Sequence, residues 1–172
     1  MQTQNEIAPR AIIVMGVSGA GKTIVGQTLA RAIGWTFADA DDFHSAENKA
    51  KMHRGIGLTD ADRAPWLASL RAHLERELAA GHRIVLACSA LKQAYRESLT
   101  PPGTTGGVRF VYLRVPRSVL HQRLADRHHA FATPALLDSQ LATLEEPTDA
   151  LDVDGTQPIS DIVDFIRANL GV

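Results

Sequence analysis

The segment Gly-Val-Ser-Gly-Ala-Gly-Lys-Thr at residues 16–23 constrains the fold of this chain more than any other feature of its sequence. It fits the pattern Gly-x-x-x-x-Gly-Lys-Ser/Thr, which indicates a phosphate-binding loop when a strand precedes it and a helix follows. Residues 11–15 form a short β-branched apolar run, and residues 24–33 carry apolar side chains at helical spacing up to Gly34. Both requirements are met, which favours a phosphate-binding loop over a glycine-rich turn with an incidental lysine.

The chemistry of such a loop explains its residue types. Glycines allow successive backbone N–H groups to turn toward phosphate oxygens at the positive end of a helix dipole. The lysine reaches the β- and γ-phosphates, and the hydroxyl after it binds Mg²⁺. We therefore predict that ATP and Mg²⁺ bind here, with Lys22 catalytic and Thr23 a metal ligand; the nucleotide-binding residues are Gly16, Val17, Ser18, Gly19, Ala20, Gly21, Lys22 and Thr23.

The remaining pattern predicts an α/β fold, because apolar runs suited to buried parallel strands alternate with longer helical patterns. The length of 172 residues fits one domain with a sizeable core, which takes in the whole chain. We expect strands at residues 11–15, 35–38, 83–88, 109–113 and 151–153, and helices at residues 24–33, 60–79, 90–99, 116–127, 134–144 and 159–170.

Composition argues against several classes of partner. A net charge of -1 gives no overall field that would favour nucleic acid or an anionic membrane. The lone Cys88 fits a reducing compartment, the first ten residues have no secretory-signal pattern, and no apolar run is long enough to span a bilayer. We expect a cytoplasmic protein that binds neither nucleic acid nor membrane.

Acidic residues follow the second predicted strand. Asp39 and Asp41 stand at alternate positions, so we expect them to face the ligand crevice at the carboxyl end of the sheet, with Asp42 facing elsewhere. They suit a metal or a substrate hydroxyl, although turn-forming aspartates in a polar loop remain an alternative. His44 could hydrogen-bond a polyol or be an exposed loop histidine.

Basic residues near the same edge suit an anionic substrate. Arg63 lies in the first turn of a predicted helix, where the dipole disfavours a cation, which indicates an anionic partner: a nearby aspartate or a substrate carboxylate. Lys92 and Arg96 are four apart on one face of the next predicted helix, and Arg123 and Arg127 are likewise one turn apart. A mobile arginine lid over the phosphates fits the second pair, and a solvated basic face is the alternative for both.

Taken together, these segments resemble the gluconokinase family, small P-loop kinases that phosphorylate D-gluconate at its 6-hydroxyl. The resemblance covers residues 12–170 and rests on five segments: MGVSGAGKT (15–23), DADDFH (39–44), LTDADRAPWL (58–67), CSALKQAYR (88–96) and LLDSQLATLEEP (136–147). It implies a nucleoside-monophosphate-kinase-like fold of three αβα layers, with a five-stranded parallel sheet in the order 2-3-1-4-5. It also implies a substrate-binding insertion at about residues 42–80, a lid at about residues 123–135, and a homodimer.

The resemblance implies roles for individual residues as well. Asp41 becomes a catalytic contact to the substrate hydroxyl, and Asp39 a residue on the Mg²⁺ side. The gluconate site comprises Asp41, His44, Arg63, Lys92 and Arg96; the lid supplies Arg123 and Arg127 as catalytic and nucleotide-binding residues; and Gln157 and Pro158 lie beside the adenine.

The sequence departs from the family pattern in the lid. Relatives commonly have Gly-His-Phe there, whereas this chain has His128-His129-Ala130-Phe131, so His129 receives no catalytic role. A shikimate kinase, a nucleotide kinase and a nucleotide-dependent switch with little catalysis remain alternatives. Shikimate kinases usually end the third strand in Gly-Gly-Gly, where this chain has Cys88-Ser89-Ala90.

Overall fold

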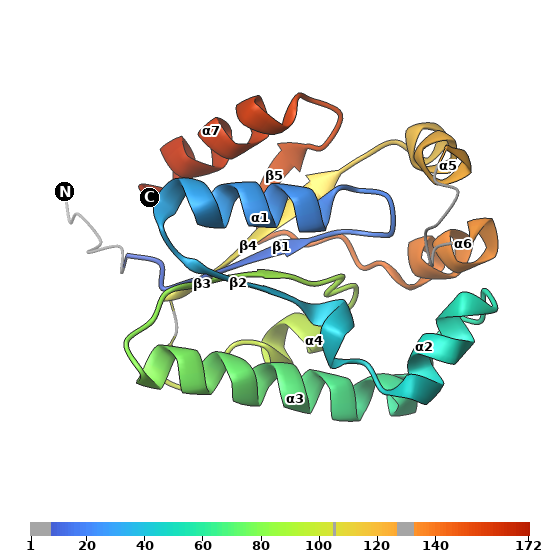
Figure 1. Ribbon diagram of the computed structural model, residues 1–172, viewed down its shortest axis with the longest axis horizontal. Coiled ribbons are helices and arrows are strands. Elements are labelled where there is room, and N and C mark those ends of the chain that lie inside the picture. Colours follow the sequence, from blue (N-terminus) through green and yellow to red (C-terminus); the bar gives the residue numbers. More distant parts are fainter. Residues whose placement is uncertain (1–7, 105, 127–132) are drawn as a thin grey trace.

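The computed structural model describes residues 8–104, 106–126 and 133–172, which form a five-stranded sheet with helices on both faces (Figure 1). The strands are β1 (Ala11–Met15), β2 (Thr36–Asp39), β3 (Ile84–Ala87), β4 (Val108–Arg114) and β5 (Leu151–Asp154). All the pairings are parallel, and the order is β2-β3-β1-β4-β5. The predicted parallel sheet and its order 2-3-1-4-5 are therefore confirmed.

Helices cover the sheet in two layers. One face carries α1 (Lys22–Ile33) and α7 (Ile159–Leu170), and the other carries α3 (Asp60–Ala79) and α4 (Gln93–Ser98) (Figure 1). At the carboxyl ends of the strands, away from the chain termini, lie the 3₁₀ helix η1 (Ala40–Phe43), α2 (Ala46–His53), α5 (Arg117–Ala125) and α6 (Pro134–Thr143). The predicted three-layer αβα architecture is confirmed.

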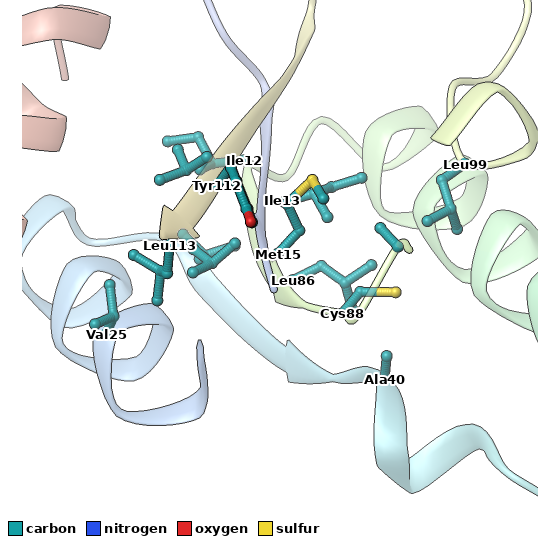
Figure 2. Close-up of a cluster of buried hydrophobic side chains, with 14 of the residues drawn as sticks. Ile12, Ile13, Met15, Val25, Ala40, Leu86, Cys88, Leu99, Tyr112 and Leu113 are labelled. Atoms are coloured by element: carbon teal, nitrogen blue, oxygen red, sulfur yellow. The ribbon is translucent and has the colours of Figure 1, made fainter. Parts of the chain in front are cut away.

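The core explains the apolar runs of the central strands. Every residue of β1 and β3 is buried, as expected of strands covered on both faces. In Figure 2, Leu113 lies beside Val25 of α1 on one side of the sheet, whereas Cys88 and Leu99 lie on the other. This packing fixes the central strand and therefore the loop that follows it.

Two local differences from the sequence prediction affect the site. The helix expected at residues 90–99 begins only at Gln93, because Ala90 has a left-handed backbone with φ of 44° and Lys92 is an extended N-cap. Helix α2 was not predicted, since its apolar periodicity is weak, and it begins where the Ser45 hydroxyl accepts a hydrogen bond from the backbone N–H of Asn48.

The segment expected to bind the acceptor, residues 42–80, contains the second half of η1, all of α2 and α3, and their connections. The segment expected to form the lid, residues 123–135, lies in part outside the described residues. None of the helices in the described parts of the chain is long and apolar enough to cross a membrane.

Candidate active site

The loop between β1 and α1 has the conformation that a phosphate site needs. Gly21, the N-cap of α1, has a left-handed backbone with φ of 97° and no side chain to cap the helix. The first N–H groups of α1 therefore stay available to an anion, as helix N-termini allow. The Lys22 Nζ lies 3.0 Å from the Val17 carbonyl oxygen, so the lysine folds back along the loop.

A cavity of about 630 Å³ begins at this loop and extends over the carboxyl ends of β2 and β3. Residues from the loop, η1, α2, α3 and α6 line it. Among the predicted site residues, those that line it are Ser18, Gly19, Gly21, Lys22, Thr23, Asp39, Asp41, His44 and Arg63. The phosphate loop and most of the predicted acceptor residues thus share one space.

The predicted metal ligands lie together. The Thr23 hydroxyl donates to the Asp39 carboxylate, with 2.6 Å between Oγ1 and Oδ2. A hydroxyl and a carboxylate beside a phosphate loop are suitable oxygen ligands for Mg²⁺, which keeps several waters and binds few protein groups. The described residues hold no group of three or more His, Cys, Asp or Glu side chains placed to bind a metal. A metal here would therefore depend on the substrate phosphates as well.

Asp41 lies on the acceptor side of Lys22. Asp41 is an exposed residue that lines the cavity, yet desolvation by the surrounding protein raises the pKa of its carboxylate, while the charge of Lys22 opposes the shift. The prediction that Asp42 faces elsewhere is wrong, because it also lines the cavity. Alternation ends with β2 at Asp39, and the 3₁₀ turn that follows has about three residues per turn.

His44 forms a buried wall of the cavity. Its side chain is 8% exposed and stacks on Trp66, with ring centroids 4.3 Å apart and planes 12° apart. The Trp66 indole N–H donates to the Ala40 carbonyl at 2.7 Å, which fixes the stack against η1. Burial, with the nearby charge of Arg63, lowers the pKa of His44 to about 4, so the ring is neutral at pH 7. Its Nδ1 is buried with no hydrogen-bond partner among the described residues.

Arg63 is 7% exposed in the first turn of α3 and borders the same cavity. One of its terminal nitrogens, Nη1, donates to the Tyr95 hydroxyl at 3.2 Å, and the guanidinium lies 5.5 Å from the centre of that ring. Within the described residues it has no carboxylate partner. Asp60 lies near enough for its charge to interact with that of Arg63, but no described carboxylate contacts the guanidinium directly. A substrate carboxylate is therefore the candidate for a direct anionic partner.

Lys92 and Arg96 are placed differently from Arg63. Lys92 lies at the start of α4 and pairs with both carboxylate oxygens of Asp60, at 3.0 and 3.1 Å. Arg96 is 3% exposed, and its Nη1 donates to the carbonyl oxygens of Ala90 and Leu91. The expectation that both share a helix face is wrong, because Lys92 precedes the helix. Neither residue lines the cavity in the described structure.

Arg123 connects two loops instead of standing free. It donates to the carbonyl oxygens of Gly19 and Ala20 in the phosphate loop, at 3.1 and 3.4 Å, and to that of Gly155 at 2.8 Å. The Gln157 amide donates to Asp154, and Pro158 is the N-cap of α7. The residues expected beside adenine therefore follow Gly155 closely, whereas Arg127 and the sequence His128-His129-Ala130-Phe131 lie outside the described residues.

Several cavity residues were not predicted from the sequence. Lys49 enters from α2, and Gln140 enters from α6. The Gln140 side-chain oxygen accepts from the backbone N–H of Ser18 at 2.7 Å, so a distant helix supplies an acceptor to the phosphate loop. The segment at 136–147 resembles the family pattern, but nothing within it indicates a contact 122 residues away.

Gly57 permits the segment between α2 and α3 to approach α6 closely. A Cβ atom built on Gly57 would lie 2.2 Å from the Ser139 Oγ and 3.2 Å from its Cβ. The chain before α3 therefore touches the helix that carries Gln140. Contacts of one helix thus reach both the phosphate loop and the acceptor side of the cavity.

Comparisons with known proteins agree with this geometry. A sequence family described as an AAA domain matches residues 12–147. A gluconokinase from Gluconobacter oxydans (strain 621H) is 47% identical over 148 residues, covering 86% of this chain and 82% of its own. The structure of a gluconokinase from Sinorhizobium meliloti 1021 aligns with a TM-score of 0.82 at 43% identity, over 95% of this chain and 93% of that one. A shikimate kinase from Aquifex aeolicus vf5 aligns with a TM-score of 0.59 at 19% identity, over 94% and 96% of the two chains, and shares the fold alone.

Proposed function

Because the chain belongs to the gluconokinase family of P-loop kinases, we propose that it transfers the γ-phosphoryl group of ATP to the 6-hydroxyl of D-gluconate. The products are ADP and 6-phospho-D-gluconate, which makes the protein an enzyme of sugar-acid catabolism. The observation that carries the proposal is the shared cavity. It has a phosphate loop at one end and, at the other, a buried arginine without a carboxylate partner among the described residues.

On the donor side, the loop N–H groups and Lys22 bind and orient the phosphates. Phosphoryl transfer through a loose transition state depends mainly on positioning and on stabilising the charge of the transferred group. Thr23 and Asp39 are the residues that would hold Mg²⁺, and their 2.6 Å contact supports that role. When bound, Mg²⁺ neutralises charge on the phosphate oxygens.

On the acceptor side, Arg63 binds the gluconate carboxylate and Asp41 orients the reacting hydroxyl. The oxygen of that hydroxyl forms a bond to the γ-phosphorus as the bond to the β–γ bridging oxygen breaks, and its proton passes to the Asp41 carboxylate. The raised pKa of Asp41 suits it to accept that proton. His44 lines the cavity and is neutral at pH 7, which suits it to contact a substrate hydroxyl.

The remaining predicted residues act around this centre. We assign Arg123 and Arg127 to the lid, where they stabilise the charge of the transferred group once the site closes and water is excluded. Gln157 and Pro158 are assigned to the adenine, supported by the contact of Arg123 with the neighbouring Gly155. Lys92 and Arg96 support the acceptor wall through Asp60 and through the backbone before α4.

The test is ADP production with different acceptors. Gluconate should accelerate ADP release in the presence of Mg²⁺, and shikimate, idonate and nucleoside monophosphates should do so much less. Acceleration by shikimate or by a nucleoside monophosphate above that by gluconate would overturn the assignment. ATP binding with no acceptor-stimulated release would indicate a nucleotide-dependent switch instead.

We propose further that the enzyme is a cytoplasmic homodimer. The family resemblance supports the dimer, and the lone Cys88, which excludes an intramolecular disulfide, supports a reducing compartment. Sedimentation equilibrium of the purified chain tests the dimer directly: a single species at the mass of one chain would contradict it.

A further inference from the structure

A second set of contacts lies behind the buried arginine. The Tyr95 hydroxyl accepts from Arg63 at 3.2 Å and donates to the Asp60 carboxylate. Asp60 in turn pairs with Lys92 through both oxygens. These residues come from the first turn of α3 and from the start of α4, and they line up as Arg63, Tyr95, Asp60 and Lys92.

The direction of these hydrogen bonds is fixed by the chemistry of the hydroxyl. A tyrosine has one O–H donor, and a carboxylate can only accept, so the proton of Tyr95 points to Asp60. The oxygen of the same hydroxyl is then available only as an acceptor, which suits the guanidinium of Arg63. Burial of the ring, together with the bond to Asp60, raises the pKa of Tyr95, so it stays protonated at pH 7.

The charges in this set are arranged unequally. Asp60 forms its ion pair with Lys92 and interacts with the charge of Arg63 only at longer range, whereas the direct contact of Arg63 is to a neutral oxygen. A carboxylate in the place of the Tyr95 hydroxyl would cancel that charge and compete with an anionic substrate. A phenol holds the guanidinium in one orientation without doing so.

We infer that Tyr95 is a positioning residue, which holds the guanidinium of Arg63 at the cavity wall for the carboxylate of the acceptor. The inference rests on the proposed function for the identity of the acceptor. The orientation of the arginine is independent of the proposed function, because it follows from the contacts of the described residues. Tyr95 is not among the described residues that line the cavity, so it acts through Arg63.

The first measurement is steady-state kinetics of Tyr95→Phe, which keeps the ring and removes the hydroxyl. Loss of a hydrogen bond to a charged group should raise the KM for gluconate about 10-fold, with kcat and the KM for ATP within about twofold. Tyr112→Phe is the matched control, because Tyr112 is a similarly buried tyrosine on β4, remote from this set, and should leave all three constants unchanged.

A double-mutant cycle separates positioning from a general structural role. In an Arg63→Ala background, adding Tyr95→Phe should change the KM for gluconate by less than about twofold, because the group that it positions is gone. An equal rise in both backgrounds would overturn the inference, as would an unchanged KM in the single variant. Should Tyr95→Phe fold poorly, Asp60→Asn removes the acceptor that directs the hydroxyl and should raise the same KM by about threefold.

Nitrogen NMR of the arginine side chain tests the orientation without any acceptor. The Arg63 signal, identified by its loss in Arg63→Ala, should show slow guanidinium rotation in the native protein and faster rotation in Tyr95→Phe. Equal rotation in the two proteins would refute the positioning role. If gluconate fails to stimulate ADP release while the rotation differs as expected, the proposed substrate is wrong and the positioning of Arg63 stands.

Discussion

The stacked histidine of the cavity should make the stability of this protein fall in mild acid. His44 has a pKa of about 4 in the fold, against an ordinary value of 6.5. Between these two values the unfolded chain binds a proton that the folded chain does not, so the free energy of unfolding decreases as the pH falls from 6.5 toward 4. Linkage gives about 2 kcal/mol for this loss at pH 5, and screening by solvent in the open cavity reduces it to about 1–2 kcal/mol.

Urea denaturation of the native protein and of His44→Asn, at pH 7.5 and at pH 5, measures this contribution. Asparagine keeps polar groups but does not titrate in this range, so the variant lacks the acid-dependent loss. At pH 7.5 the variant should be the less stable protein, because it loses the stack on Trp66, and the gap should narrow by about 1–2 kcal/mol at pH 5. The exposed His82, changed to asparagine, controls for the loss of a histidine as such. A gap that stays constant between the two pH values would refute a neutral, buried His44.

Four further substitutions test other parts of the site. Lys22→Ala should abolish gluconate-dependent ADP release and leave the circular dichroism spectrum intact; retained turnover would exclude Lys22 from catalysis. Asp41→Asn should lower kcat about 100-fold or more with little change in ATP affinity, and near-native turnover would contradict its role as orienting group and proton acceptor. Arg63→Lys should raise the KM for gluconate more than 10-fold, because an ammonium cannot reproduce a bidentate contact, whereas an unchanged KM would place the carboxylate elsewhere. Gly155→Ala should lower the melting temperature by several degrees, because its Cβ would lie 2.5 Å from the Val115 Cγ2; calorimetry checks this, and an unchanged transition would show that the loop relaxes freely.

Local pattern was enough to predict the phosphate loop and the elements on either side of it. The loop at residues 16–23 lies between a buried strand and a helix, and each of these three segments can be recognised from consecutive residues. Thr23 and Asp39 could be placed together as well, since the end of β2 and the start of α1 meet at the same edge of a parallel sheet.

The acceptor half of the site depends on contacts between residues that are distant in the sequence, which the spacing of residues cannot predict. Lys92 is engaged by Asp60, 32 residues away, and a left-handed Ala90 delays the helix that was expected to carry it. Asp42 lines the cavity because a 3₁₀ turn replaces the strand alternation. Gln140 reaches the loop only through the packing of α6, which apolar periodicity cannot specify.

The bond from Ser18 to Gln140 determines what a ligand must exchange at the loop. The backbone N–H of Ser18 already donates to the neutral amide oxygen of Gln140 at 2.7 Å. A ligand that accepts from this N–H must therefore displace the glutamine. Hydrogen bonds to an ionised oxygen are about twice as strong as those between neutral groups, so an anionic phosphate can win that exchange and an uncharged hydroxyl cannot. Displacement of Gln140 from the Ser18 N–H therefore favours an anionic acceptor over a neutral one.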